Sequence, residues 1–245
     1  MSFLQRVLYF IEEYGASFWQ GVQISAFLAA AGTALGCVIG FAAGAVSALS
    51  AEPEDSLPRR VLLRAVRTVV AVYVWLFRGT PMMVQAMVVF YGSSYFGADL
   101  DPIACGLCIV AVNTGAYMTE TVRGGIQSLD PGQSEGAAAI GMTRGQAMRL
   151  VLLPQAFRGA VPQIGNYLIS NVKDTSVLSV ITVGELFYVG RALAGQYFLF
   201  FEVFTVVCLI YLVLTSVTTA LVHLAEKWLA GPKDYDLAPA AQEAA

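Results

Sequence analysis

The sequence predicts an all-α membrane protein with five transmembrane helices. Of its 245 residues, 57% are apolar and only 13% are charged, whereas about 25% of the residues in soluble domains are charged. The mean hydropathy is +0.67, and apolar runs long enough to cross a bilayer recur along the chain. So few charges cannot cover this much apolar surface in water, which excludes a soluble globular protein. No basic run lies on a polar face, which argues against nucleic-acid binding.

The spans are placed by apolar runs that lie between polar turns. A helix needs roughly 20 apolar residues to cross the hydrocarbon, and longer segments cross tilted or broken. Breaks are expected at Thr80-Pro81 in the second span and at Thr175-Ser176 in the fourth. The five spans are expected at 20–48, 66–95, 102–122, 159–189 and 198–225, and the short connections make 17–228 a single domain.

The distribution of basic residues predicts the orientation. Ten of the fourteen lysines and arginines flank the connections after the first, third and fifth spans: Arg59, Arg60, Arg64, Arg67, Arg123, Arg144, Arg149, Arg158, Lys227 and Lys233. Because basic loops stay in the cytoplasm, the N-terminus is expected outside and the C-terminus inside. Five spans also require the two termini to lie on opposite sides of the membrane.

Segments outside the spans carry their own patterns. In 1–16, apolar residues recur at helical spacing, which predicts an amphipathic helix on the outer membrane surface; a plain extension of the first span is the alternative. This stripe consists of Phe3, Leu4, Val7, Leu8 and Ile11. The tail at 229–245 contains prolines and mixed charges and is predicted to be disordered and cytoplasmic.

A glycine stripe marks the first span. Gly32, Gly36, Gly40 and Gly44 follow each other at steps of four residues and therefore line one face of the helix. Small residues allow the backbone of another helix to approach closely in lipid. The stripe predicts tight packing, either within the chain or against a partner subunit.

The connection between the third and fourth spans, at about 130–157, has a helical pattern of its own. A first short helix is expected to begin at Gln133 or Ser134, to run through alanines, and to end at Gly141, since glycine accepts the left-handed conformation after a helix. Thr143 is expected to cap a second helix, and Pro154 to close the unit.

This connection resembles the EAA loop of the permease subunits of ATP-binding-cassette (ABC) importers. The family pattern is Glu-Ala-Ala, three residues, Gly, nine residues, Ile-x-Leu-Pro. The chain keeps the spacing, with glycine for the first alanine and valine for isoleucine, at Glu135, Gly136, Ala137, Gly141, Val151, Leu153 and Pro154. The resemblance implies a pair of coupling helices whose residues Glu135, Gly136, Ala137, Ala138, Gly141 and Pro154 dock on an ATPase.

Further motifs resemble the polar amino acid branch of these importers, of the histidine, glutamine, glutamate and arginine type. They are Arg78-Gly79-Thr80-Pro81 with Gln85, Gly115-Ala116-Tyr117 with Glu120, Arg123-Gly124-Gly125-Ile126, and Lys173-Asp174-Thr175-Ser176 followed by Gly184-Glu185-Leu186. The resemblance covers roughly residues 17–228. It implies a permease in the cytoplasmic (inner) membrane that moves polar amino acids by alternating access.

The resemblance also implies the partners. They are two cytoplasmic ATPase subunits, a second permease subunit that is identical or related, an extracytoplasmic amino-acid-binding protein, and membrane lipid. The chain contains no GxxxxGK[ST] phosphate loop. It is therefore expected to be no enzyme and to hold no cofactor, with ATP and Mg²⁺ on the partner ATPase.

Polar residues in the spans are candidates for a substrate path or gate, because such groups are costly in a bilayer. They are Arg78, Thr80, Gln85, Asn113, Tyr117, Glu120, Lys173, Asp174, Thr175, Ser176 and Glu185. Asn113 and Tyr117 lie at i and i+4 and are expected to share a face that lines the path. Structural and gating roles stay open beside substrate contact. For Glu120, a structural ion pair with Arg123 at i and i+3 is weighed equally with a role in a gate.

Other functions are weighed against this interpretation. The same permease class with another cargo, such as an opine, ectoine or a sulfur amino acid, is one alternative; a non-transporting scaffold or channel is another. Cys105 and Cys108 form a CxxC pair without a second pair, so small packing residues are favoured over a thiol site. No metal-ligand set or catalytic nucleophile–base pair is visible, which disfavours a membrane enzyme.

Overall fold

The computed structural model describes residues 2–49 and 56–230, and within these ranges the secondary structure is entirely helical. The all-α class predicted from the composition is therefore confirmed for the described residues. The elements are α1 (Phe3–Ala48), α2 (Leu57–Gly79), α3 (Met82–Tyr95), α4 (Pro102–Gln127), α5 (Pro131–Ala139), α6 (Arg144–Ala147), the π-turn η1 (Met148–Leu152), α7 (Leu153–Asp174), the 3₁₀-helix η2 (Thr175–Ile181), α8 (Leu186–Tyr197) and α9 (Phe200–Ala230).

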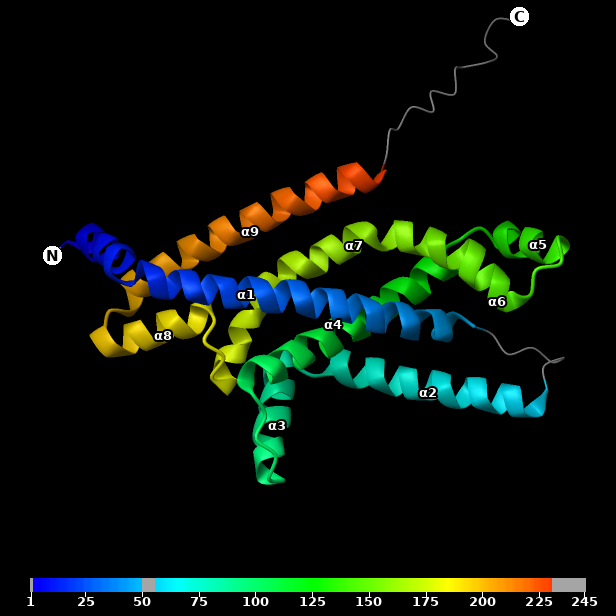
Figure 1. Ribbon diagram of the computed structural model, residues 1–245, viewed down its shortest axis with the longest axis horizontal. Helices are drawn as coiled ribbons and strands as arrows, with labels where there is room; N and C mark the ends of the chain where they lie inside the picture. Colours follow the sequence, from blue (N-terminus) through cyan, green and yellow to red (C-terminus); the bar gives the residue numbers. More distant parts are fainter. Residues whose placement is uncertain (1, 50–55, 231–245) are drawn as a thin grey trace, which may run out of the picture.

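Helices α1 and α4 form the central pair of the bundle (Figure 1). The glycine stripe of α1 lies directly on α4, so the predicted tight packing is within the chain. A Cβ atom added at Gly36 would lie 2.7 Å from Thr114 Cβ and 2.9 Å from the carbonyl oxygen of Ala111. One at Gly44 would lie 2.6 Å from Val122 Cβ. Without a side chain on this face, the two backbones approach to a distance that only glycine permits.

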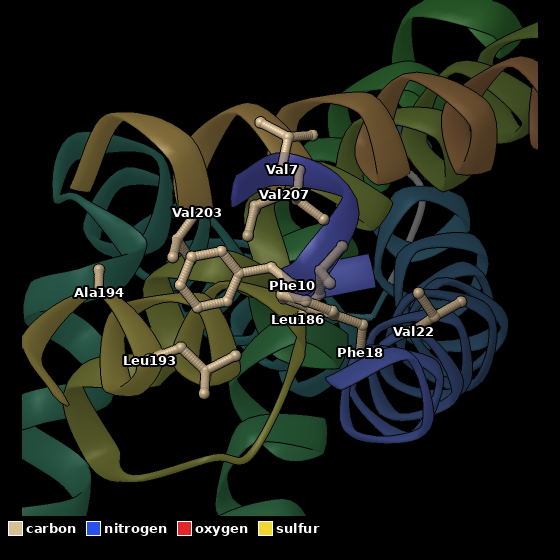
Figure 2. Close-up of a cluster of buried hydrophobic side chains, with 10 residues drawn as sticks. Val7, Phe10, Phe18, Val22, Leu186, Leu193, Ala194, Val203 and Val207 are labelled. Carbon is tan, nitrogen blue, oxygen red and sulfur yellow. The ribbon is translucent and has the colours of Figure 1, made fainter. Parts of the chain in front are cut away.

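The first turns of α1 are helical, and they pack against α8 and α9 mainly through side chains outside the apolar stripe that was predicted to lie on the membrane surface. Figure 2 shows Phe10 inserted among side chains of α8 and α9, and Phe10 is fully buried. Of the predicted stripe only Val7 is buried, whereas Leu4 is 64% exposed. The reason is tertiary, because Phe10 packs edge-on against Tyr197 and the Arg6 guanidinium donates a 3.0 Å hydrogen bond to Glu202.

The predicted second span, 66–95, is not one helix. It divides into α2 and α3, and α3 points away from the line of α2 (Figure 1). The break lies at Thr80 and Pro81, as expected. Proline has no backbone N–H and restricts the preceding residue to extended backbone, and Thr80 has φ −126° and ψ 146°.

The predicted fourth span, 159–189, is also interrupted. Helix α7 ends at Asp174, the chain tightens into η2, and Thr182 takes a left-handed conformation with φ 64° before α8 begins. This confirms the break expected at Thr175-Ser176. Helix α8 was not predicted, and it leaves the preceding segment at an angle of 52°.

Three described helices are long and apolar enough to cross a membrane: Phe3–Ala48, Pro102–Gln127 and Phe200–Leu229. The bent segment that contains α7 and α8 raises the number to four if it counts as one span. Helix α2 does not qualify, because arginines occupy its first half. Length and composition therefore give three or four candidate spans. Neither α2 nor α3 qualifies alone, so the predicted second span would require the two helices to cross the membrane together.

The connection between α4 and α7 folds as two short helices, as predicted. Gly141 has φ 79°, and Met142 N–H bonds to the carbonyl of Ala137, which closes the C-terminus of α5. Thr143 caps α6 in a reciprocal arrangement with Gln146. The first helix begins at Pro131, earlier than predicted, because Asp130 caps it.

Pro154 does not close this unit, contrary to the prediction. It lies in the first turn of α7, where a helix tolerates the missing N–H. The chain enters α7 through η1, whose wider turn bonds Leu153 N–H to the carbonyl of Met148. Helix α6 therefore runs on through η1 into α7. The predicted tail is corrected at its start, since α9 extends to Ala230; the remainder lies outside the described residues.

Candidate functional site

A cavity of about 610 Å³ lies where the break between α2 and α3 meets α4 and α7. Its wall contains four of the predicted site residues, and the structure brings them together from three parts of the chain. The lining residues are Thr80, Pro81, Met82, Met83, Asn113, Thr114, Tyr117, Tyr167, Ser170, Asn171, Asp174 and Val177. Polar groups on an otherwise apolar wall are the usual composition of a small-molecule site.

A hydrogen-bond network joins the helix break to α4. The Gln85 amide nitrogen donates to the carbonyl oxygens of Phe77 and Thr80, at 3.0 and 2.9 Å. Its amide oxygen accepts a 3.1 Å bond from Asn113, whose nitrogen also donates to Phe77. The carbonyls left without helical partners at the end of α2 are thereby satisfied by side chains. Gln85 is 8% exposed and supports Asn113 from behind the cavity wall.

Arg78 and Glu120 belong to a second network on the other side of Tyr117. The guanidinium of Arg78 lies 5.2 Å from the centre of the Tyr117 ring, in cation–π geometry. One of its nitrogens is 3.9 Å from Glu120, which also forms a two-point ion pair with Arg123 at 2.6 and 3.1 Å. Glu120 thus links α2 to α4: its predicted pairing with Arg123 is present, and Arg78 is a second partner.

Helix α7 contributes a polar stripe to the cavity wall, and only its last residue, Asp174, was predicted as a site residue. Tyr167, Ser170 and Asn171 precede Asp174 at the spacing of one helix face, and all four line the cavity. The i, i+3, i+4, i+7 pattern was available in the sequence. Three of these residues are neutral, so the cost of placing a charge in a span does not single them out.

Three predicted residues around the α7 break are outside the cavity wall. Lys173 is exposed and points away from Asp174, as expected for neighbours on a helix. Thr175 is fully buried and donates a 3.1 Å hydrogen bond to the Val172 carbonyl. Ser176 is half-buried. These residues form the break, and Asp174 alone of the motif lines the cavity.

Glu185 lies away from the cavity, fully buried at the start of α8. Its carboxylate accepts backbone N–H groups from Phe187 and Tyr188, at 2.8 and 2.7 Å, and the hydroxyl of Tyr211 on α9 at 2.9 Å. The next residue, Leu186, donates its N–H to Ser25 on α1. Glu185 therefore caps α8 and ties it to α9, so its geometry is structural.

Replacing Glu185 with glutamine is expected to lower the free energy of unfolding by about 1–3 kcal/mol, the cost of one unsatisfied buried polar group. All three of its donors need an acceptor, and the amide nitrogen of glutamine is not one. Thermal unfolding of the purified protein in detergent measures this. Tyr211→Phe removes one of the three donors and keeps the cap, so its effect should be smaller. A Glu185→Gln protein as stable as the original would contradict the capping role.

Helices α5 and α6 lie at one end of the bundle (Figure 1). A second cavity, of about 450 Å³, lies between α5, α6, η1, the end of α1 and the start of α2. Glu135 and Ala138 line it together with Arg59 of α2 and Arg144 of α6. Gly136 is exposed, and a side chain added there would meet no atom of the chain within 4 Å.

Ala137 is 5% exposed and packs inside the loop. The surface available to a partner therefore does not include it, although the resemblance placed it among the docking residues. Ile140, at the end of α5, is 74% exposed. The outward surface therefore combines an open glycine with an exposed apolar side chain.

The described residues contain no group of three or more histidine, cysteine or carboxylate side chains that could hold a metal ion. Cys105 is buried and Cys108 is exposed, and both are free thiols. The cavity wall itself offers hydroxyl and amide groups and the carboxylate of Asp174.

Curated proteins with similar sequences are transport permeases. The nopaline transport system permease protein NocM of Agrobacterium fabrum (strain C58) is 38% identical over 167 residues, which are 64% of this chain and 69% of NocM. The glutamine transport system permease protein GlnP of Escherichia coli (strain K12) is 30% identical over 210 residues, which are 85% of this chain and 90% of GlnP. The second alignment includes both helix breaks and the coupling loop.

The fold and the family model agree with these relatives. A chain in the crystal structure of an amino acid ABC transporter with histidines superposes with a TM-score of 0.77 and 28% identity, covering 93% of this chain and 99% of that one. The model of the binding-protein-dependent transport system inner membrane component matches residues 40–231. The chain belongs to this family, as a multi-pass inner-membrane permease component of an ABC importer that is not itself an enzyme.

Proposed function

We propose that this permease moves polar amino acids through the cavity between α4, α7 and the α2–α3 break. The observation that carries the proposal is the meeting of two broken helices with the Asn113–Tyr117 face at one polar cavity. Broken helices offer backbone donors and acceptors at membrane depth, which suits a zwitterionic cargo. The volume of about 610 Å³ also lies in the usual range for small-molecule sites.

The proposed topology has five crossings, with α2 and α3 together making the second. The N-terminus lies outside and the C-terminus in the cytoplasm. Supporting this, the coupling helices lie at the same end of the bundle as the basic start of α2, while α8 and the first turns of α1 lie at the other end (Figure 1). Basic residues gathered at one end are typical of a cytoplasmic side.

The proposed mechanism is alternating access driven from the coupling helices. Two ATPase subunits dock on α5 and α6, a second permease subunit completes the pathway, and an extracytoplasmic binding protein delivers the amino acid. Because α6 continues through η1 into α7, a displacement of the coupling helices is transmitted directly to the helix that carries Ser170, Asn171 and Asp174. The ligand-bound and ATP-bound states then select different arrangements of α7.

A different cargo is the second candidate, favoured by the nopaline permease among the relatives. Nopaline is an opine, and the opine alternative weighed from the sequence therefore stays open. Cargo is selected mainly by the binding protein in the proposed system. A scaffold or channel role is disfavoured by the family and by the complete coupling loop.

Asn113→Ala and Tyr117→Ala are expected to reduce amino-acid uptake by tenfold or more, because each removes a polar contact of the cavity wall. Uptake by proteoliposomes that contain the full complex measures this, with expression and ATPase assembly verified for each variant. Cys108→Ala is a matched control, since Cys108 is an exposed residue of the same helix outside the wall. Normal affinity and rate in both cavity variants would overturn the proposed path.

A further inference from the structure

Asn171 joins three helices at the wall of the cavity. It is 8% exposed and lies on α7. Its amide nitrogen donates to the hydroxyl of Thr33 on α1 at 2.8 Å and to the hydroxyl of Thr114 on α4 at 2.9 Å. Both N–H groups of the amide are therefore engaged, each by a different helix.

The hydroxyl of Thr33 fixes which end of the Asn171 amide faces α1. Thr33 donates its own proton to the Ala29 carbonyl oxygen at 2.6 Å, a bond within α1. Its oxygen is then left only as an acceptor, so the group opposite it must be the amide nitrogen. A flipped amide would place two acceptors face to face in a buried site. The orientation of the Asn171 amide is thus fixed by the hydrogen-bonding roles of its partners and not by steric fit alone.

The amide oxygen of Asn171 consequently faces the cavity. No described residue donates a hydrogen bond to it, yet among residues 2–49 and 56–230 no fully buried side-chain nitrogen or oxygen lacks a partner. This oxygen therefore has accessible surface, and the cavity is where Asn171 is exposed. The network of Gln85 and Phe77 holds Asn113 in the same way and leaves its amide oxygen free.

The geometry points to Asn171 as a positioning and specificity residue, whose fixed amide oxygen accepts a hydrogen bond from the ammonium group of a bound amino acid. The inference rests on the proposed function of the cavity and adds an orientation for the cargo. An ammonium group has three donors and no acceptor, which complements the oxygens of Asn113 and Asn171 beside the carboxylate of Asp174. The carboxylate of Asp174 on the same wall would repel a carboxylate of the cargo, so the cargo enters with its ammonium group toward α7.

Equilibrium binding to the permease–ATPase complex, without the binding protein, tests this assignment. The probes are radiolabelled L-glutamine, L-histidine, L-arginine and L-cystine. Asn171→Ala should raise the Kd of the bound probe about tenfold to a hundredfold, because it removes an acceptor for a charged group. Thr33→Val should raise it about threefold to tenfold, since the released amide can turn its nitrogen toward the cavity. Thr33→Ser keeps the hydroxyl and should restore the original Kd.

Thr119→Val is the matched control. Thr119 is a buried threonine of α4 outside the cavity wall, and its hydroxyl bonds only to the Gly115 carbonyl of its own helix. Equal weakening by Thr33→Val and Thr119→Val would indicate a general loss of packing and overturn the inference.

The remaining outcomes separate the inference from the proposed function. Unchanged binding in Asn171→Ala and Thr33→Val, with weakened binding in Asn113→Ala and Tyr117→Ala, overturns the role of Asn171 and leaves the cavity as the cargo site. Unchanged binding in all four variants, or no binding of any probe by the original complex, overturns the proposed function itself. Competition adds a direct test, because N-acetyl-L-glutamine lacks the ammonium group and should fail to displace L-glutamine.

Discussion

Replacing Gly36 with leucine should remove folded permease from the membrane. The Cβ atom alone would lie 2.9 Å from the carbonyl oxygen of Ala111, which belongs to the backbone of α4 and cannot move aside as a side chain would. Overpacking in a core costs about 1–3 kcal/mol, and we expect the upper end of that range here because the central helix pair must separate. The yield of monodisperse protein after detergent extraction measures the effect.

Gly15→Leu provides the matched control on the same helix. A Cβ atom added at Gly15 meets no atom within 4 Å, so the protein should extract as well as the original. Gly36→Ala should lie between the two, because one methyl group already forces α4 outward. Normal yields of Gly36→Leu would contradict the close packing of α1 on α4 and the reading of the glycine stripe.

Replacing Gly136 with tryptophan, together with Glu135→Arg, is expected to abolish ATPase docking while the permease stays folded. Both residues are exposed on α5. A Cβ atom added at Gly136 meets no atom within 4 Å, so the larger side chain should not clash with the rest of the permease. A partner shaped to a small-residue helix would meet a bulky ring and a reversed charge. Co-purification with the ATPase subunits and substrate-stimulated ATP hydrolysis measure the loss.

A bulky residue at Ala137 is the instructive comparison, because Ala137 is buried within the loop. Ala137→Trp should lower the stability of the permease itself, whereas Gly136→Trp should leave its unfolding temperature unchanged. An intact complex with substrate-stimulated ATP hydrolysis in the Gly136→Trp, Glu135→Arg double variant would show that α5 is not the coupling surface.

Local sequence chemistry was sufficient to predict several elements of the fold. The glycine stripe, the break at Pro81, the left-handed Gly141 and the cap at Thr143 each depend on a property of one or a few residues: a missing side chain, a missing N–H, or a hydroxyl at the right spacing. These properties act within one turn of helix or along one helix face. They are therefore readable without knowledge of the neighbours.

Features that depend on distant neighbours were not predictable in this way. Phe10 is buried because it packs against Tyr197 and against side chains of α9. No pattern within 1–16 distinguishes Phe10 from the exposed Leu4. Pro154 was expected to end a helix, but η1 lets the chain accommodate it at the start of α7. Glu185 was grouped with path residues because it is charged, and its donors on α8 and α9 become visible only in three dimensions.

The cavity itself was partly predictable. Asn113, Tyr117 and Thr80 were expected to face one path, and they do line one cavity. Asn171 was not expected, because the polar stripe of α7 to which it belongs does not show which groups its amide bonds to. Its significance comes from Thr33 and Thr114, which lie 138 and 57 positions away in the sequence.

Uptake of radiolabelled amino acids into proteoliposomes tests the central claim most directly. The vesicles contain the permease complex with its ATPase subunits, the binding protein is supplied outside, and ATP is enclosed or omitted. At least one polar amino acid should accumulate against its gradient only with ATP inside, and Asn113→Ala and Tyr117→Ala should reduce this accumulation. Accumulation of no polar amino acid or opine in a panel, or equilibration without ATP, would contradict it.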